Sequence, residues 1–452
     1  MKILPDCMLH KRPIKEKLLK GGAWAFAGKL VTALSGLAIS ALLARLLIPE
    51  EMGAYFLTLS LVSVAAIVIQ LGLTQTIIRL VAESMGTERS GRARQSVILV
   101  LRIIAFSGLI VACLLAFGVG EWVSEQVFKS VIMSQVVGLV SVWAVINAFQ
   151  SLMAEVYRGF HDIRLATIFG GLITSVLVMG LFLGLWLVQG HSQLHQAVAL
   201  TIGAGLSSVL LSSVFLWRKL KLLPYEKISI STLEILHISW PLWITTLILF
   251  VLTQVDLWIM GIFRSPEEVA VYGMVARTVA LLTMPLLIVN AVVPPLIAEM
   301  YAQGKIKELE KELRTVATLT GIPSLIVLVI FVFFGDSILG LFFGEFYQTG
   351  AMLLAILSLG QLANVWAGSC GLTLMLTGHQ STMMFITVFC GMFTAGAAWF
   401  LVESYGGVGV STAAACGMTL QNILMLLFVK KKIGIWTHAD LLLIKKIEAK
   451  AQ

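Results

Sequence analysis

The sequence predicts an all-α integral membrane protein with about twelve transmembrane helices, in two six-helix lobes related by pseudo-twofold symmetry around a central cavity. Three observations support this prediction: the composition, the spacing of the apolar runs, and a motif present in each half. Of the 452 residues, 58% are hydrophobic and 12% are charged, and the mean hydropathy is +0.95. A soluble core of this length has no room for so much apolar surface, so a bilayer must solvate the helices.

Long apolar runs recur along the chain and are separated by short charged breaks. Runs of about 20 residues or more are what spans of roughly 30 Å of hydrocarbon require. The run at 24–47 follows a basic leader but exceeds the apolar core of a signal peptide, so we expect an uncleaved first helix. The helices are expected at about 22–46, 54–78, 96–119, 132–155, 164–188, 197–217, 237–263, 270–297, 315–335, 350–376, 382–403 and 408–429.

Lysine and arginine are distributed unevenly between the two sides of the predicted membrane. About 26 of the 32 basic residues lie in the leader, in the connections after helices 2, 4, 6 and 8, and in the tail, against about 3 on the other side. Cytoplasmic connections retain positive charge, so both termini are expected in the cytoplasm, with the chain in the inner (cytoplasmic) membrane. The asymmetry accounts for the net charge of +8 without a nucleic-acid partner.

The connections between the expected helices are short, and none on the outer side exceeds roughly 16 residues, so no catalytic domain fits there. The predicted organisation is a cytoplasmic basic leader (1–21), an N-terminal six-helix lobe (22–217), a cytoplasmic inter-lobe connection (218–236), a C-terminal six-helix lobe (237–429) and a cytoplasmic tail with an amphipathic interfacial helix (430–452).

Motifs of catalysis and of cofactor binding are absent from the sequence. The five cysteines include no C-x-x-C pair, and neither a G-x-x-x-x-G-K-[ST] loop nor a D-x-D motif occurs. We therefore expect no enzyme and no cofactor or metal, and no hydrolysis of ATP by the chain itself.

A motif of the form Pro-Glu-Glu-x-x-x-Tyr occurs at 49–55, after the first helix, and again at 266–272, after the seventh. Proline at the first helical position with acids in the first turn is a common helix start, so the motif is expected to cap both helices. Its recurrence also indicates that the two halves are copies with the same orientation. Parallel repeats of this kind commonly enclose a binding site and work by rocking.

Several segments together resemble the polysaccharide repeat-unit flippases of the multidrug, oligosaccharidyl-lipid and polysaccharide exporter superfamily. They are Gly-Gly-Ala-Trp at 21–24, Ala-Arg-Leu-Leu-Ile-Pro-Glu-Glu-Met-Gly at 44–53, Arg-Gly-Phe at 158–160, Gln-Val-Asp-Leu-Trp-Ile-Met-Gly at 254–261 and Ser-Pro-Glu-Glu at 265–268. The resemblance covers nearly the whole chain, and it is more specific to the superfamily than to one substrate.

The resemblance implies a bacterial inner-membrane flippase that moves a polyprenyl-pyrophosphate-linked oligosaccharide from the inner to the outer leaflet by alternating access, for the biosynthesis of O-antigen, capsule or exopolysaccharide. The implied partners are the undecaprenyl-pyrophosphate-linked saccharide, membrane lipids and polysaccharide assembly proteins. Lipid II flippases typically have fourteen helices, which makes that substrate a weaker match to about twelve.

Ionisable residues inside the spans are the candidates for the mechanism, because a charge in hydrocarbon costs at least a few kcal/mol without water, a partner or a ligand. They are Lys29, Arg102, Asp256 and Arg277. Cations in a low-dielectric cavity suit a pyrophosphate. In the family that the chain resembles, basic residues on helices 1 and 8 face the cavity, and Lys29 and Arg277 are the matching positions.

Two alternatives remain open for these charges. By the expected boundaries, Asp256 and Arg277 lie at equal depth across one hairpin, so they are candidates for mutual neutralisation, a role that does not exclude binding of the substrate by Arg277. Asp256 is also the candidate for a proton or sodium site if transport is ion-coupled. Arg102 is close enough to the inner end of its helix to snorkel into water.

Uncharged polar residues in the spans are candidates for contacts with sugar hydroxyls, although hydrogen bonds between helices explain them equally well. Those that we assign to the site are Gln70, Asn147, Gln254 and Asn364.

The sequence is also compatible with two other functions. One is a cation-coupled multidrug exporter of the same superfamily, whose cavity should be acidic, whereas here the cations in the spans outnumber the acids. The other is a membrane enzyme of polysaccharide assembly, which the missing D-x-D motif and the short outer connections disfavour.

Overall fold

The structure, a computed structural model, describes residues 14–224, 231–290 and 293–440, with only the backbone described for 14–26 and Lys29. Within these ranges the chain is almost entirely helical and has no strand. The first half contains α1 (Ile14–Leu46), α2 (Pro49–Gln70), α3 (Leu73–Gly86), α4 (Ser90–Leu114), η1 (Leu115–Val119), α5 (Gly120–Trp122), η2 (Val123–Val127), α6 (Val131–Ser134), α7 (Val137–Gly159), α8 (Ile163–Thr167), η3 (Ile168–Leu172), α9 (Ile173–Gln189) and α10 (Leu194–Lys221). The second half contains α11 (Thr232–Phe263), α12 (Pro266–Val279), η4 (Ala280–Thr283), α13 (Met284–Asn290), α14 (Val293–Ala302), α15 (Ile306–Phe343), η5 (Glu345–Gly350), α16 (Ala351–Ala367), α17 (Cys370–Leu376) and α18 (Gln380–Ile433).

Ten helical segments within the described residues are long and apolar enough to cross a membrane. One of them, α18, has 54 residues, or about 80 Å at 1.5 Å per residue, which is more than two crossings need. Its backbone leaves the helical region at Gly406 (φ 55°, ψ −138°), so α18 supplies two spans. With α1, whose apolar part Leu30–Leu46 is shorter, the fold has about twelve spans, as the sequence predicts.

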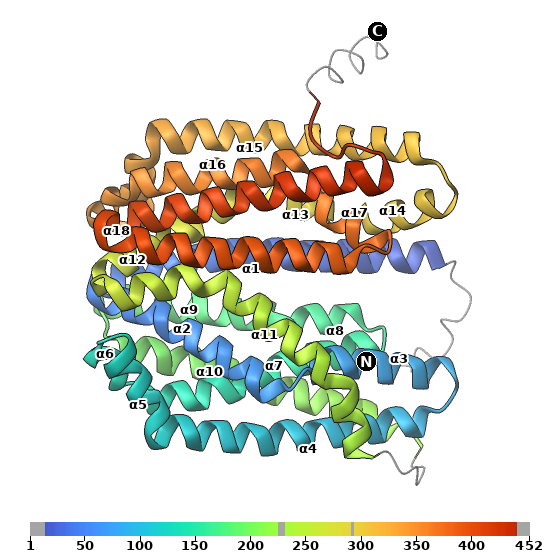
Figure 1. Ribbon diagram of the computed structural model, residues 1–452. Helices are drawn as coiled ribbons and strands as arrows, with labels where there is room; N and C mark the ends of the chain where they lie inside the picture. The colour runs from blue at the N-terminus through green and yellow to red at the C-terminus, as the bar shows by residue number, and fades with distance from the viewer. Residues whose placement is uncertain (1–13, 225–230, 291–292, 441–452) are drawn as a thin grey trace.

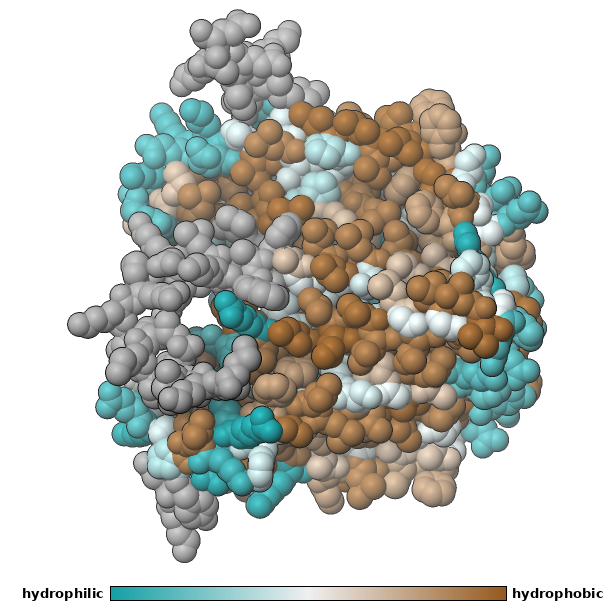
Figure 2. Space-filling view, turned by 180° about the vertical axis from the view of Figure 1, so that it is seen from behind, coloured by the Kyte–Doolittle hydropathy of each residue, from teal (hydrophilic) through white to brown (hydrophobic). Residues whose placement is uncertain are grey.

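The helices form two lobes, with α2 to α10 in one and α12 to α18 in the other, and α1 and α11 lie between them (Figure 1). Helices α2 and α12, which carry the two copies of the motif, run in the same direction and pack against each other. This arrangement confirms the two duplicated lobes. Figure 2 shows a broad hydrophobic band with hydrophilic residues gathered at its two ends, as a membrane protein requires.

The two ends of the molecule differ in charge and are named here by their residues. The Pro-Glu-Glu end is the one where α2 and α12 begin, at Pro49 and Pro266. The basic end is the opposite one, where α10 and α18 finish with basic residues in their last turns: Arg218, Lys219, Lys221, Lys430, Lys431 and Lys432.

The repeated motif caps both helices, as expected. In each copy the proline occupies the start of the helix and two glutamates occupy the first turn. The fixed φ of proline suits this position, and the acids complement the positive end of the helix dipole. The sequence places the second of these starts at residue 270, whereas α12 begins at Pro266, so every later residue of α12 lies about one turn deeper than expected.

The helix expected at 54–78 is interrupted, because α2 ends at Gln70 and α3 begins at Leu73. Between them Leu71 (φ 48°) and Gly72 (φ 74°) have left-handed backbones. A Cβ on Gly72 would lie 2.3 Å from the carbonyl oxygen of Ser239 in α11. Glycine is therefore required for the close approach of α11 as well as for the turn.

The segment 435–440, which follows α18, is not helical where the structure describes it. It folds back onto α15 and α16: Asp440 forms an ion pair with Arg314 at 2.9 Å, and the amide of Ala439 donates to the carbonyl of Trp366 at 2.9 Å. The rest of the expected interfacial helix, 441–452, lies outside the described residues.

Candidate functional site

A cavity of about 380 Å³ lies between the lobes, where α2 of one lobe meets α11 and α12. We call it the interlobe cavity. Its lining is a mixture of apolar, hydroxyl and charged side chains: Phe56, Leu59, Ser60, Ser63, Thr253, Gln254, Asp256, Leu257, Tyr272, Gly273, Ala276, Arg277 and Ala280.

The lobes touch closely on the side of this cavity that faces the Pro-Glu-Glu end. A Cβ on Gly53 would lie 1.8 Å from the carbonyl oxygen of Pro266, so the two helix starts meet backbone to backbone. One layer deeper, the ring of Phe56 covers Gly273, where a Cβ would meet it at 2.4 Å.

A second contact closes the same end on the other side of the molecule. Arg45, at the end of α1, donates from Nη2 to the carbonyl oxygen of Leu341 in α15 at 3.1 Å. Its guanidinium also lies 5.9 Å from the ring centre of Trp186. The described conformation is therefore closed at the Pro-Glu-Glu end.

The carboxyl group of Asp256 in α11 is held by Tyr272 in α12. The Tyr272 hydroxyl donates to Oδ2 at 2.6 Å, and the backbone amide of Leu257 contacts Oδ1 at 2.9 Å. Asp256 lies about 10 Å from the end of α11 and Tyr272 about 9 Å from the start of α12, which explains why they meet. The tyrosine of the repeated motif is thus the partner of the acid.

Arg277 does not pair with Asp256. Its distance from the start of α12 is about 16 Å, roughly one turn deeper than the acid and close to the middle of a bilayer. Its side chain lines the interlobe cavity and is exposed there. No ion pair joins it to an acid in the described part of the chain. The sequence left open whether Asp256 and Arg277 neutralise each other. In this conformation they do not.

The remaining candidates from the sequence are distributed as follows. Gln254 lines the interlobe cavity beside Asp256. Arg102 is exposed on α4, and Gln70 is buried at the end of α2. Asn147 is half-buried on α7, and Asn364 on α16 donates to Gln361 Oε1 at 3.3 Å.

The structure therefore brings Gln254, Asp256 and Arg277 together, and places Arg102, Gln70, Asn147 and Asn364 outside the lining of this cavity. Lys29 belongs to α1, but its side chain lies outside the described residues.

Several lining residues were not singled out from the sequence. Ser60 and Ser63 on α2 and Thr253 on α11 bring hydroxyl groups to the cavity. The indole of Trp258 donates to Ser60 Oγ at 2.6 Å and ties α11 to α2. Serine and threonine are common in membrane helices, so their presence did not mark these positions as part of a site. Among the lining residues that were missed, Tyr272 alone had a signal in the sequence, its place in the repeated motif.

The side chains of this cavity are suited to binding a polar or charged ligand. The cavity offers one guanidinium, one carboxyl group held by a phenol, and hydroxyl and amide groups that can bond to sugars or water. No cluster of three or more His, Cys, Asp or Glu side chains positioned for a metal occurs among residues 14–224, 231–290 and 293–440.

Two duplicated lobes of membrane helices around such a cavity are an architecture that many secondary transporters share. The model of the family described as polysaccharide biosynthesis protein matches residues 18–301, and the MatE model matches residues 241–400. The chain belongs to the polysaccharide biosynthesis protein family. No curated protein matches the sequence.

Solved structures share the fold at low sequence identity. A multidrug resistance MATE family transporter of the MOP superfamily, in its inward-facing conformation, has a TM-score of 0.72 and 16% identity, covering 89% of this chain and 94% of that one. The lipid II flippase MurJ, in an inward closed conformation, has 0.65 and 15%, covering 90% and 87%. A MOP superfamily transporter from Pyrococcus furiosus, described by the reverse polarity of its binding pocket, has 0.59 and 16%, covering 96% and 99%.

Proposed function

We propose that this protein is a flippase that carries a polyprenyl-pyrophosphate-linked oligosaccharide from the inner to the outer leaflet of the cytoplasmic membrane, for polysaccharide biosynthesis. The observation that carries the proposal is Arg277, a guanidinium at mid-membrane depth that lines the interlobe cavity without an acidic partner among the described residues. An unpaired cation there is costly unless a ligand neutralises it. A pyrophosphate supplies both the charge and the acceptor geometry that a guanidinium favours.

The rest of the cavity fits the sugar that such a lipid carries. Ser60, Ser63 and Thr253 present hydroxyl groups, and Gln254 presents an amide, on the walls around Arg277. These groups exchange hydrogen bonds with sugar hydroxyls at little cost. In this proposal Arg277 binds the pyrophosphate and the polar walls bind the saccharide, and the family match supports a substrate of polysaccharide biosynthesis.

The direction of transport follows from the charge asymmetry. We place the basic end in the cytoplasm, because positive charge is retained on that side. The described conformation, which is closed at the Pro-Glu-Glu end, is then the one that receives substrate from the inner leaflet.

Substitution of Arg277 tests the proposal. Arg277→Ala removes a charge-assisted interaction of about 1.5–3 kcal/mol, so the rate of translocation should fall at least about tenfold. Arg277→Lys keeps the charge and loses the bidentate geometry, so it should retain an intermediate rate. The measurement is the flipping of a lipid-linked oligosaccharide in proteoliposomes, together with surface glycan in cells.

The matched control is Arg102→Gln, which removes a cation from a span away from the interlobe cavity and should leave the rate unchanged. Normal translocation by Arg277→Ala, with the protein present in the membrane in normal amount, would exclude Arg277 from substrate binding and remove the main support for a flippase.

A multidrug exporter is the second candidate, favoured by the MatE match over residues 241–400 and by the acid in the cavity, Asp256. In that case Asp256 attracts an organic cation and Arg277 opposes it, so Arg277→Ala should maintain or increase transport. Export of an organic cation from liposomes that contain no lipid-linked sugar would favour this candidate.

A further inference from the structure

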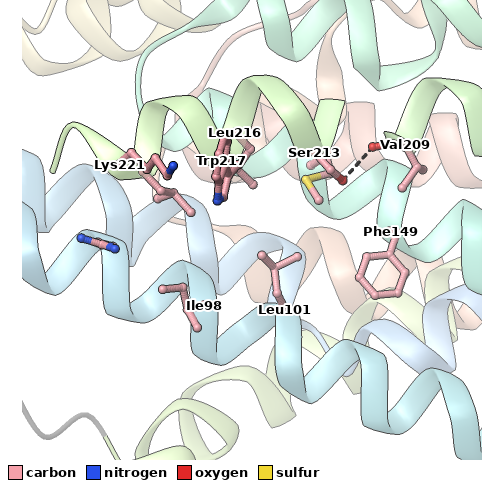
Figure 3. A pocket seen from close by; sticks show the side chains of 11 residues that line it. Ile98, Leu101, Phe149, Val209, Ser213, Leu216, Trp217 and Lys221 are labelled. Carbon is pink, nitrogen blue, oxygen red and sulfur yellow. Dashed lines mark hydrogen bonds between the residues drawn. The ribbon is translucent and has the colours of Figure 1, made fainter. Parts of the chain in front are cut away.

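A second and larger cavity, of about 680 Å³, lies within the first lobe. We call it the α4–α10 groove, because α4 and α10 form its walls and α7 its floor (Figure 3). It shares no lining residue with the interlobe cavity. Its lining residues are Arg94, Ile98, Leu101, Phe149, Met153, Val209, Ser213, Leu216, Trp217, Leu220 and Lys221.

The groove is apolar over most of its length. Isoleucine, leucine, valine, methionine and phenylalanine side chains from three helices line it. The one hydroxyl in the lining, of Ser213, donates to the carbonyl oxygen of Val209 at 2.7 Å and is satisfied within α10. The walls between the two ends are therefore mainly apolar, and they suit a hydrocarbon chain.

The groove is cationic at one end. Arg94, near the start of α4, and Lys221, at the end of α10, both lie at the basic end. The ammonium of Lys221 lies 3.5 Å from the ring centre of Trp217, and Arg94 Nη1 donates to the carbonyl oxygen of Leu223 at 3.1 Å. No acidic side chain is among the described residues of the lining. Arg94 takes part in further interactions, whereas Lys221 forms no ion pair with a described residue, so the charge to be matched at this end is that of Lys221. Electrostatic complementarity calls for an anionic group beside Lys221 and an apolar one beyond it.

The length of the groove corresponds to one leaflet. Figure 3 shows Lys221 at one end, Trp217 and Leu101 along the middle, and Val209 and Phe149 at the other end. Along α10, the stretch from Lys221 to Val209 measures about 18 Å, slightly more than half of a hydrocarbon core of roughly 30 Å. A chain that begins at the charged end would therefore finish near the middle of the bilayer.

The outer rim of the groove faces lipid. Large apolar side chains next to the lining on α10 are exposed, including Leu210 (58%) and Val214 (47%), and Trp217 in the lining is 56% exposed. Exposed apolar side chains on a membrane span contact acyl chains. An occupant can therefore enter sideways from the leaflet without passing through the interlobe cavity.

From these observations we infer that the α4–α10 groove is a binding site for an anionic membrane phospholipid. The phosphate lies beside Lys221, and one acyl chain lies along the apolar floor. The carrier lipid of the proposed substrate has the same two chemical parts, a phosphate and a hydrocarbon chain. We assign the groove to a bilayer phospholipid because the groove opens to the leaflet and has no lining residue in common with the cavity that holds Arg277.

Fluorescence of Trp217 reports on the occupant. The full-length protein is placed in nanodiscs of phosphatidylcholine that contain increasing fractions of phosphatidylglycerol with brominated acyl chains. The part of the quenching that Trp217→Phe removes is the signal from the groove. We expect it to saturate at a low fraction of phosphatidylglycerol, and brominated phosphatidylcholine to quench only in proportion to its abundance. Because one basic side chain near an anionic lipid contributes about fivefold in affinity, Lys221→Gln should weaken the preference about fivefold.

The matched control is Arg218→Gln, which removes an equal charge from the same turn of α10 but lies outside the lining. Equal preferences in the two variants, or equal quenching by the two lipids, would overturn the inference. Leu101→Phe fills the groove without changing the charge and should lower the Trp217 signal. Native mass spectrometry, in which Lys221→Gln should retain fewer phosphatidylglycerol molecules, gives an independent count. Displacement of the brominated lipid by stoichiometric undecaprenyl pyrophosphate would assign the groove to the carrier instead.

Discussion

Asp256 is an acid inside a membrane span, and a neutral phenol rather than a cation holds it. The bond from Tyr272, at 2.6 Å, joins the last helix segment before the Pro-Glu-Glu connection to the first one after it. Each partner has a polar atom that would otherwise lack a donor or acceptor in an apolar setting, which is costly. The pair therefore fixes the hairpin and leaves the guanidinium of Arg277 available in the cavity.

Tyr272→Phe tests the stabilising role of this bond. The ring is kept and the hydroxyl is lost, so Asp256 loses a donor and the free energy of unfolding should fall by about 1–3 kcal/mol. Thermal unfolding in detergent measures the change. Tyr347→Phe is the control, because the Tyr347 hydroxyl is buried with no hydrogen-bond partner in the described structure, so its removal should cost nothing. A Tyr272→Phe protein no less stable than Tyr347→Phe would show that the bond contributes little.

At this scale, sequence reasoning could find the charges but not their partners. Arg277 and Asp256 stand out because ionisable residues are rare in spans. Hydropathy has no information on which face of a helix looks into a cavity, so it could not show that Arg102 lies outside the interlobe cavity. The Asp256–Tyr272 bond also depended on the true start of α12, since the expected start at 270 brings the wrong residue to the depth of the acid.

Among the helices, α2 and α12 form the contact that closes the Pro-Glu-Glu end. The meeting of Gly53 with the backbone of Pro266 leaves no room for any side chain. The presence and approximate position of most spans were predictable, because a bilayer demands long apolar runs. Their ends were less so: α15, for example, runs from Ile306 to Phe343, against the expected 315–335. The interruption at Gly72 was not predictable, because the glycine is required by the close approach of Ser239, which belongs to a helix far away in the sequence.

Gly53→Ala should shift the balance of conformations. The added methyl group would lie 1.8 Å from the Pro266 oxygen, so α2 and α12 must separate, and the state closed at that end loses stability relative to an open one. A cysteine at Ser63, which lines the interlobe cavity, reports the change. Its modification by a membrane-impermeant maleimide applied at the Pro-Glu-Glu end should become faster.

Gly138→Ala is the control for this experiment. Gly138 lies near the start of α7, and a Cβ there would meet nothing within 4 Å. Alanine should be tolerated at that position, with the cysteine at Ser63 no more reactive than in the parent protein. The same modification rate in both glycine variants would mean that the Gly53 contact does not hold the lobes together.

For the whole molecule, the proposed orientation rests on where the basic residues gather. Two exposed positions report on it: Ala302, the last residue of α14 at the basic end, and Thr349, just before the start of α16 at the other end. A cysteine is introduced at each. With Cys7, Cys113 and Cys416 replaced by alanine, an impermeant thiol reagent added to intact cells should modify the cysteine at 349 and spare that at 302. The reverse pattern in intact cells would invert the topology and the direction of transport.

The lobes are joined on one flank by α11, which follows α2 and α3 through most of the membrane. At its far end Trp243 Nε1 donates to the carbonyl of Ile67 at 3.1 Å, and near its other end Gly261 sits against Leu57. A motion that separates the lobes at the Pro-Glu-Glu end must either bend α11 or move α2 and α3 together with it. Pro241 has no backbone N–H, so it leaves one carbonyl of α11 without its usual donor, close to Gly72. Bending of α11 therefore costs least at this point. The two lobes would then rotate about this hinge rather than separate by the same distance along their whole length.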